Sequence, residues 1–351
     1  MQLNTCKRSE KIAIIGTGAI GLAIAYLLND DHCPLIGISS TRNYLLQSTG
    51  ITLIDKGKKS TLSLHVKKTL DSDVDIVILT TKIDDSLESL TQNYPFVRNA
   101  VIITCQNGIG IEKKLYTLFP PSQVVSTLVL FGATMNSPSE VVYNFPGSWI
   151  MQLPKAFEAH KKEMLIATLK NAGNLLLTED IEPIRHLKLF LNMNNCFPAI
   201  LGKSMQEVFS DHQISKIAMA LWRECYRVLT LSGKNIADIP DFPKERFLKL
   251  LAISLDTAAE IFTSIMTNLS KEPIYGSFYQ SIAKGKKTEV DYINGFFCSL
   301  ALPLSLSTPI NDKIIALVHS CEKTGVFLSS QELWQQIVPF ISMNQEEDFN
   351  G

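Results

Sequence analysis

A short apolar run that meets a glycine-rich turn is the feature that most constrains the fold. Residues 11–15 (KIAII) precede Gly16-Thr17-Gly18-Ala19-Ile20-Gly21, and residues 19–28 continue as an apolar helix candidate. In such a turn the first glycine permits a tight bend, the second lets the backbone approach a pyrophosphate, and the third allows close helix–strand packing. The helix N-terminus adds amides and a positive dipole. The pattern predicts a dinucleotide site, with a purely structural turn as the alternative.

Short β-rich runs alternate with helical segments through the first half of the chain, which indicates a parallel sheet covered on both faces. We expect strands at 34–38, 51–54, 61–66, 75–80 and 100–104, with further runs at 123–131, 140–144 and 148–153 extending or flanking the sheet. Later residues follow helical patterns, at 155–172, 184–202, 213–232, 244–268, 276–302 and 309–323.

The sequence therefore predicts an α/β fold in two parts. The boundary is expected near residues 178–183, an acidic stretch with a proline after a short strand at 175–177. Residues 1–178 would form a Rossmann-type dinucleotide-binding domain, and residues 179–351 an all-α domain.

Composition narrows the class of protein. The 351 residues include 33 Lys and Arg against 34 Asp and Glu, a net charge of −1, which argues against a nucleic-acid or anionic-membrane surface. Seven scattered cysteines without a Cys-x-x-Cys pair indicate reduced thiols in a cytoplasmic protein. The polar N-terminus lacks a signal peptide's apolar core. The six histidines lack metal-ligand spacing, so no metal is expected.

The end of the second predicted strand indicates which nucleotide binds. An NAD site usually carries Asp or Glu there for the ribose diol. This strand ends Ile38-Ser39-Ser40-Thr41-Arg42, without an acid. Hydroxyls and the Arg42 guanidinium suit a 2′-phosphate, so NADP is predicted over NAD. The alternative is that Arg42 starts the next helix on the surface.

The stretch KGKKTEVDYINGFF, residues 284–297, contains two acids with different surroundings. Wound as a helix, Val290, Ile293 and Phe297 form an apolar arc that also includes Glu289, whereas Asp291 lies on the far side and is expected to be solvated. An ionised carboxylate on a core-facing arc is costly unless paired. Glu289 therefore either caps the first helical turn or lines a cleft and meets a cation.

A second helical stretch supplies a candidate cation. Lys188, Asn192 and Asn195 share one stripe of a helical wheel, opposite an apolar face. No carboxylate occurs from 186 to 206, and asparagine is a poor helix former, which favours a binding face over a solvent-facing stripe. Pro198 should kink or end this helix.

These motifs resemble those of the ketopantoate reductases (2-dehydropantoate 2-reductases), over roughly residues 9–325. The family has a Rossmann domain followed by a helical domain and makes pantoate for coenzyme A synthesis. The matching elements, in the family's order, are GTGAIG at 16–21, Lys82 after DIVILTTK, QNGIG at 106–110, Lys188-Leu189-x-x-Asn192, GSFYQ at 276–280, TEVDYING at 288–295, and Thr308-Pro309-x-Asn311.

The resemblance implies catalytic roles for two residues. Lys188 would be the general acid that protonates the 2-keto oxygen as hydride arrives, which is the donor that a developing negative charge requires. Glu289 would orient or pair with Lys188 and contact the cofactor ribose. Desolvation would lower the pKa of Lys188 and Glu289 would raise it, and either effect could dominate.

The same resemblance implies how the ligands bind. Asn192 and Ser277 would bind the substrate, the serine at its carboxylate. Asn107 would lie between substrate and cofactor, and Lys82 near the cofactor. The implied partners are NADPH and a small 2-keto acid, and the protein would be a monomer or homodimer.

Departures from the family pattern fall on the substrate side. Cys196, Phe197 and Pro198 occupy a region where the family commonly has an asparagine, Gln206 approximately replaces another, and Ser281 follows Gln280 where an aspartate is frequent. The alternatives to ketopantoate reduction are a related reductase of another 2-keto acid and an inactive NADP sensor.

Overall fold

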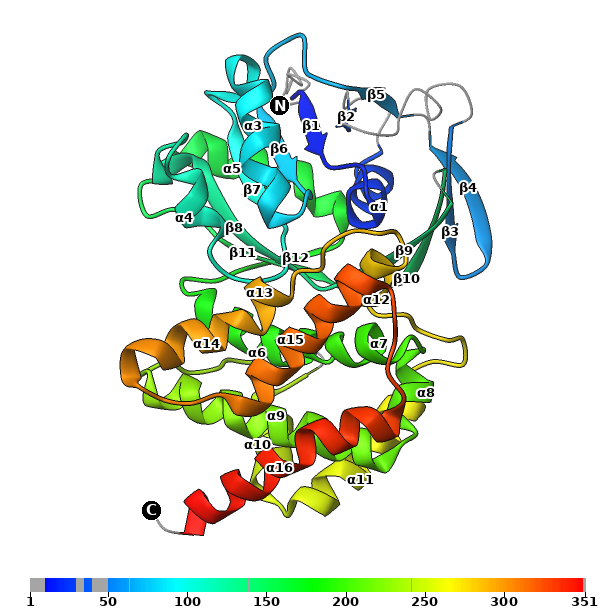
Figure 1. Cartoon of the computed structure of the whole chain (residues 1–351). Helices are drawn as coiled ribbons and strands as arrows, with labels where there is room; N and C mark the ends of the chain where they lie inside the picture. The colour runs from blue at the N-terminus through cyan, green and yellow to red at the C-terminus, as the bar shows by residue number, and fades with distance from the viewer. Residues whose placement is uncertain are drawn as a thin grey trace. The chain divides into compact units, whose positions relative to one another are not determined.

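The computed structural model describes residues 10–29, 35–39, 50–62, 64–137, 139–240 and 242–349. The chain forms two compact units (Figure 1). The first consists of Met1–Gln106 and Gly110–Ile181, and the second of Asn107–Ile109 and Glu182–Gly351. The short segment Asn107–Ile109 thus belongs with the second unit although it leaves a strand of the first.

An eight-stranded sheet organises the first unit. Its strands are β1 (Ile12–Ile15), β2 (Leu35–Ile38), β5 (His65–Lys67), β6 (Ile76–Leu79), β7 (Val101–Thr104), β8 (Val124–Val129), β11 (Ser148–Gln152) and β12 (Asn174–Leu177). The order is β12-β11-β8-β7-β6-β1-β2-β5. The six neighbouring strands β8, β7, β6, β1, β2 and β5 all run parallel to one another. Strand β11 pairs antiparallel with β8. The predicted Rossmann-type α/β fold is confirmed.

The central strands are apolar because both faces of the sheet are covered. Every residue of β1, β6 and β7 is buried. The helices in the described part of this unit are α1 (Ala19–Leu27), α3 (Ile83–Val97), α4 (Ile111–Leu115) and α5 (Ala159–Leu169), with 3₁₀ turns η1 (Pro121–Gln123) and η2 (Lys170–Ala172). Buried parallel strands of this kind read as continuous apolar runs, which is how the sequence revealed them.

A second sheet in the first unit was not predicted. It has the order β4-β3-β10-β9 and consists of β3 (Ile51–Asp55), β4 (Lys58–Leu62), β9 (Gly132–Ser137) and β10 (Glu140–Phe145). The placement of 51–54 in the parallel sheet is wrong, because β3 pairs with β10 instead. The run at 61–66 is divided between β4 and β5. Both sheets share one apolar core, to which α1 contributes Leu22 and Ile24.

The described residues of the second unit are almost entirely helical, as predicted. Its helices are α6 (Glu182–Met193), α7 (Cys196–Leu201), α8 (Met205–Phe209), α9 (His212–Leu231), α10 (Lys244–Ala252), α11 (Leu255–Thr267), α12 (Ser277–Ile282), α13 (Val290–Ile293), α14 (Gly295–Ala301), α15 (Pro309–Thr324) and α16 (Ser330–Phe349), with η3 (Leu302–Leu304). None of the helices in the described part of the chain is long and apolar enough to cross a membrane.

Three of the predicted long helices are broken. The break between α6 and α7 precedes Pro198, which lies in the first turn of α7 where a missing N–H is tolerated, so the expected effect of this proline is confirmed. The predicted helix at 276–302 is wrong. Helix α12 ends in a Schellman motif at Gly285, whose φ is +63°, and Lys286 N–H donates to Ser281 C=O at 2.9 Å. The pattern at 244–268 divides at Ser254, the N-cap of α11.

Aromatic side chains pack the centre of the second unit. The Phe190 ring of α6 lies 4.7 Å from the Phe247 ring and 4.9 Å from the Phe297 ring, centroid to centroid, and edge-on to Trp222 of α9. All four side chains are buried. This cluster fixes the rotation of α6, so the opposite, polar face of α6 is held in one orientation.

Candidate active site

The glycine turn lies where the strand order of the main sheet reverses. Strand β1 pairs with β6 on one side and β2 on the other, all parallel, so the three carboxyl ends meet at one edge. Residues 16–21 follow β1, and Lys82 follows β6. In open α/β sheets, ligands bind at this edge and at this reversal point.

The three glycines of the turn have different reasons to lack a side chain. A Cβ on Gly21 would lie 2.0 Å from Gly16 O, and one on Gly16, where φ is +109°, would lie 2.5 Å from Thr81 N. A Cβ on Gly18 would meet no described atom within 4 Å. Packing therefore dictates Gly16 and Gly21, whereas Gly18 faces open space that suits a group approaching the backbone.

The start of α1 also fits an anionic group. Gly18 is its N-cap and offers no side-chain cap, and no acid stands in the first turn, whose residues are all described. The first-turn amides and the helix dipole therefore remain available to phosphate oxygens. Thr17 is buried, while Ala19 and Ile20 are half-buried at the helix start. The turn fits a dinucleotide phosphate.

Lys82 and Arg42 are two other residues that the sequence assigned to cofactor binding. Lys82 is half-buried at the N-cap of α3, and its carbonyl oxygen accepts a hydrogen bond from Ser86 Oγ at 2.8 Å. Arg42 lies outside the described residues, within 40–49. The preference for a 2′-phosphate consequently stays a prediction.

Gln106 connects the ends of two strands. Its Nε2 donates to Thr81 O and Ser86 Oγ, both at 3.1 Å, and its Oε1 accepts from Cys105 N. The residue is 6% exposed, and these three bonds fix the direction in which the chain leaves β7. Sequence reasoning placed Gln106 in a motif but assigned it no task.

Asn107 and Gly108 make their contacts within the second unit. Asn192 Nδ2 of α6 donates to Asn107 Oδ1 at 3.3 Å. Gly108 has φ +96°, and a Cβ there would lie 2.9 Å from Tyr292 O of α13. The glycine thus permits the close approach that brings Asn107 to Asn192, two residues that the sequence placed in the same site.

Lys188 projects from α6 one turn before Asn192. It is half-buried between Leu187 and Leu189, and burial lowers the pKa of Lys188 from 10.5 to about 8. Among the described residues its ammonium has no hydrogen-bond or ion-pair partner. Of the two opposing effects that the sequence left open, desolvation dominates.

Asn195 joins this polar face to α12, although it lies beyond the end of α6. Its Nδ2 donates to Asn192 O at 2.8 Å, and its Oδ1 accepts from Ser277 N at 3.3 Å. A Cβ on Gly276 would lie 2.5 Å from Asn195 Oδ1, so glycine is required there. The structure brings Ser277, which is exposed, beside the stripe that begins at Lys188.

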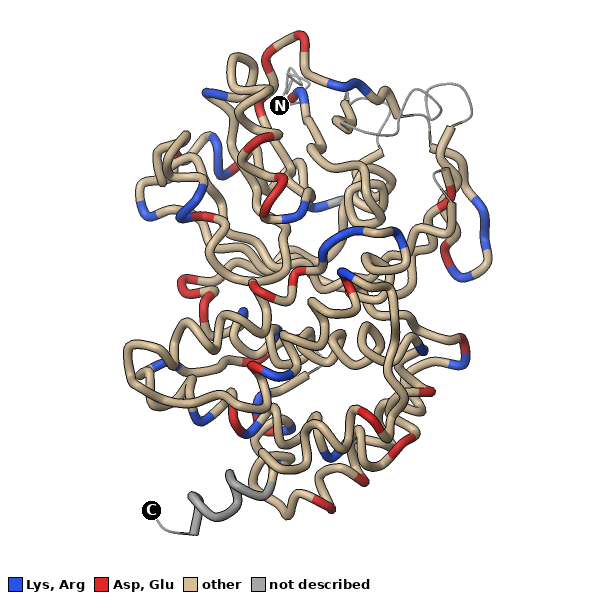
Figure 2. The backbone as a smooth tube through the Cα atoms, viewed as in Figure 1, with Lys and Arg blue, Asp and Glu red and all other residues tan. Residues whose placement is uncertain are grey.

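Glu289 occupies a position that the helical wheel described incorrectly. It precedes α13 rather than lying within a long helix, is half-buried, and does not cap α13 with its side chain. Glu289 is thus the N-cap residue of α13, as the capping alternative places it, but its side chain makes no capping hydrogen bond. An ion pair with Lys188 is not formed within the described part of the chain. Helix α13 packs against α6, which brings the Glu289 backbone to the helix that carries Lys188. The loop before it, residues 284–287, is exposed, and its Lys positions are blue in Figure 2.

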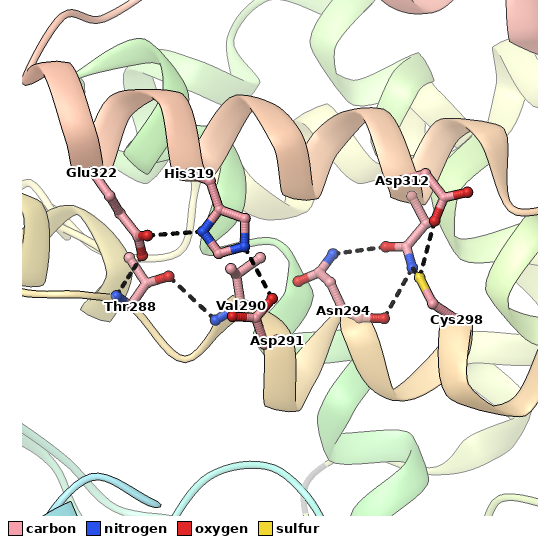
Figure 3. Close-up of polar contacts among 9 residues, drawn as sticks. Thr288, Val290, Asp291, Asn294, Cys298, Asp312, His319 and Glu322 are labelled. Carbon is pink, nitrogen blue, oxygen red and sulfur yellow. Dashed lines mark hydrogen bonds and ion pairs between the residues drawn. The ribbon is translucent and has the colours of Figure 1, made fainter. Parts of the chain in front are cut away.

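Asp291 is exposed, as expected, but it is not simply solvated. Its Oδ1 lies 3.0 Å from Nε2 of His319 on α15, and His319 Nδ1 lies 2.9 Å from Glu322 Oε2 (Figure 3). Glu322 Oε1 accepts from Thr288 N at 2.6 Å. The segment Thr288–Asp291 is consequently attached to α15 on both sides of Glu289.

The later motif residues support the fold. Asn294 Nδ2 donates to Asn311 Oδ1 at 3.1 Å, and Asn311 Nδ2 donates to Asn294 O at 2.9 Å, both residues being fully buried. Glu224 of α9 accepts from the backbone amides of Ile310 and Asn311 at 3.0 and 2.8 Å and so caps α15. Glu224 was not singled out from the sequence. The available signal was a carboxylate among apolar residues in the helix predicted at 213–232.

Two of the departures from the resemblance, at 196–198 and at Gln206, lie in the packing of the second unit. Cys196, Phe197 and Pro198 are buried. The Gln206 amide is used by the backbone of the loop before α12: Nε2 donates to Ser270 O and Glu272 O, and Oε1 accepts from Ile274 N at 2.9 Å.

Comparisons with known proteins agree with both units. The family model "Ketopantoate reductase PanE/ApbA" matches residues 12–156, and "Ketopantoate reductase PanE/ApbA C terminal" matches 180–322. The 2-dehydropantoate 2-reductase of Pyrococcus horikoshii is 27% identical over 324 residues, covering 90% of this chain and 98% of that protein.

Two solved structures share the fold. One is D-mandelate dehydrogenase with NADH and anilino(oxo)acetate, at 22% identity and a TM-score of 0.76, covering 90% of this chain and 99% of that one. The other is a PanE/ApbA family ketopantoate reductase from Ralstonia eutropha, at 20% identity and a TM-score of 0.72, covering 89% and 98%.

Proposed function

Because the chain belongs to the ketopantoate reductase PanE/ApbA family, we propose that it reduces 2-dehydropantoate to (R)-pantoate with NADPH, a step of coenzyme A synthesis. The observation that carries the proposal is Lys188: a half-buried amine with a pKa of about 8, one helical turn from an asparagine that contacts Asn107. An oxidoreductase of this kind needs a proton donor at the reacting oxygen and a nucleotide site, and the chain has candidates for both.

The first unit would hold the nucleotide. Gly16 to Gly21 would receive the pyrophosphate at the start of α1, with Lys82 at the same sheet edge and Arg42 at the 2′-phosphate. The bound cofactor would supply the hydride. Its 2′-phosphate selectivity rests on the absence of an acid after the second strand, from 38 to 42.

The second unit would bind the keto acid and supply the proton. With a pKa of about 8, roughly nine-tenths of Lys188 is protonated at pH 7. A lysine so poised donates a proton to a developing alkoxide more readily than an ordinary lysine. Asn192 and Asn107 would bind the substrate beside it, Ser277 would bind the carboxylate, and Glu289 would orient Lys188.

One alternative substrate class has an observation in its favour. D-mandelate dehydrogenase, solved with NADH and anilino(oxo)acetate, shares this fold. A reductase of another 2-keto acid would have the same lysine and the same glycine turn. An NADP sensor is less suited, because sensing needs no proton donor.

The test is NADPH oxidation by the purified protein, followed at 340 nm, with ketopantoate and with pyruvate, 2-ketoisovalerate and phenylglyoxylate, each also with NADH. We expect the highest kcat/KM with NADPH and ketopantoate. A higher kcat/KM with another keto acid would reassign the substrate. Bound NADPH without turnover on any keto acid would favour the sensor. Lys188→Ala is the control and should lower kcat by about 10²-fold or more.

A further inference from the structure

The segment Thr288–Asp291 is held by a group of side chains on α15 that the proposed mechanism does not use. His319 and Glu322 stand one turn apart on that helix. His319 contacts Asp291 at 3.0 Å and Glu322 at 2.9 Å, and Glu322 accepts from Thr288 N at 2.6 Å (Figure 3). Glu289 lies between the two attached residues.

We propose that His319 is the positioning residue for Glu289, because it bridges Asp291 and Glu322 and so fixes the segment Thr288–Asp291 on α15. The proposal rests on the proposed function, in which Glu289 orients Lys188. It assigns a task to the exposed Asp291 and His319 and to the half-buried Glu322.

The chemistry of the bridge specifies its protonation state. Both ring nitrogens of His319 face carboxylate oxygens, which only accept hydrogen bonds, and a neutral imidazole carries a single N–H. Both contacts are hydrogen bonds only when the ring is an imidazolium. Burial lowers the pKa of His319, but hydrogen bonds to Glu322 and Asp291 outweigh it and raise the pKa overall, in agreement with this geometry.

Glu289 stands at the N-cap of α13, a helix of four residues. Thr288 Oγ1 accepts from Val290 N at 3.2 Å, so the attachment of Thr288 extends across Glu289 to the first residue of α13. A displacement of a reacting group by about 1 Å can lower a rate by about 10²-fold, so loss of the bridge should be visible in kcat.

The chain offers a matched control. His212 of α9 faces Asp256 at 3.9 Å, with side chains 45% and 65% exposed, against 44% and 64% for His319 and Asp291. His319→Ala and His212→Ala therefore remove equally exposed histidines next to a carboxylate. We expect kcat to fall about tenfold or more in His319→Ala, with less than a twofold change in KM for the keto acid, and no change in His212→Ala.

Two further measurements separate positioning from general stability. In a Glu289→Gln background, His319→Ala should have no further effect on kcat, because it acts through Glu289. Backbone hydrogen exchange of peptides covering 286–294 should become faster in His319→Ala and not in His212→Ala. Unchanged exchange, or additive losses of kcat, would overturn the proposal. If the wild type reduces no keto acid, the proposed function fails, and hydrogen exchange alone decides whether His319 holds the segment.

Discussion

Lys188 has an unfavourable environment for a charged group, and this has a measurable consequence for stability. The pKa of Lys188 falls from 10.5 to about 8 because burial disfavours the ammonium. A shift of this size corresponds to about 3 kcal/mol between the two protonation states. Replacing Lys188 with methionine keeps the linear shape and removes the charge, so it should stabilise the fold at pH 7 by roughly 1–3 kcal/mol while abolishing the proton donor.

The pH dependence of this gain follows from proton linkage. Between pH 8 and pH 10.5 the unfolded chain holds a proton on Lys188 that the folded chain has released, so the stability of the wild type rises with pH in that window. Below pH 8 the full penalty is present, and above pH 10.5 none remains. The stability difference between Lys188→Met and wild type should therefore be largest at pH 7 and should close by about pH 10.5.

Urea unfolding of both proteins at pH 7, 8, 9 and 10 measures this difference. In parallel, wild-type kcat/KM, with both substrates well below saturation, should fall about tenfold per pH unit above pH 8. A methionine variant less stable than wild type at pH 7 would refute the reasoning. So would a stability difference that stays constant with pH, or a kcat/KM that is flat to pH 10.

Substitutions at four other residues test separate parts of the structure. Gly21→Ala should destabilise the first unit by at least about 2 kcal/mol because of the contact with Gly16 O, whereas Gly18→Ala should leave the thermal unfolding midpoint unchanged and weaken NADPH binding in titration calorimetry. Arg42→Ala should raise the Kd of NADPH far more than that of NADH, and equal changes would contradict a 2′-phosphate contact. Glu224→Ala should reduce the free energy of unfolding by about 3 kcal/mol by orphaning two buried amides, and Glu224→Gln by less.

The first unit was predictable because its strands are buried on both faces and read as apolar runs next to a glycine turn. The second sheet was not predictable, since β3 and β10 pair across more than eighty residues and no local periodicity encodes such a register. Long-range pairing is a property of the tertiary structure, whereas the bend at Gly16 and the packing of Gly21 are local.

The helical unit shows a different limitation. The pattern at 276–302 indicated one continuous helix, but Gly285 ends α12 in a left-handed conformation and α13 begins only at Val290. A glycine in a basic stretch is a known helix-end signal and was available in the sequence. The roles of His319 and Glu322 could not be read in advance, because a spacing of three on α15 gives no indication of what faces it.

In two of the signature motifs, neighbouring polar residues have different roles. Gln106 uses its amide on the backbone and Ser86, and Thr288 uses its amide and hydroxyl on Glu322 and Val290, whereas the neighbours Asn107 and Glu289 stand where a ligand or Lys188 is proposed. A side chain whose hydrogen-bonding groups are bound to the surrounding protein cannot at the same time bind substrate or orient a proton donor. We therefore assign the ligand-binding or orienting role to the next residue in each motif, Asn107 or Glu289. Substituting the supporting residues should change stability and hydrogen exchange together with rate, whereas substituting their neighbours should change rate alone.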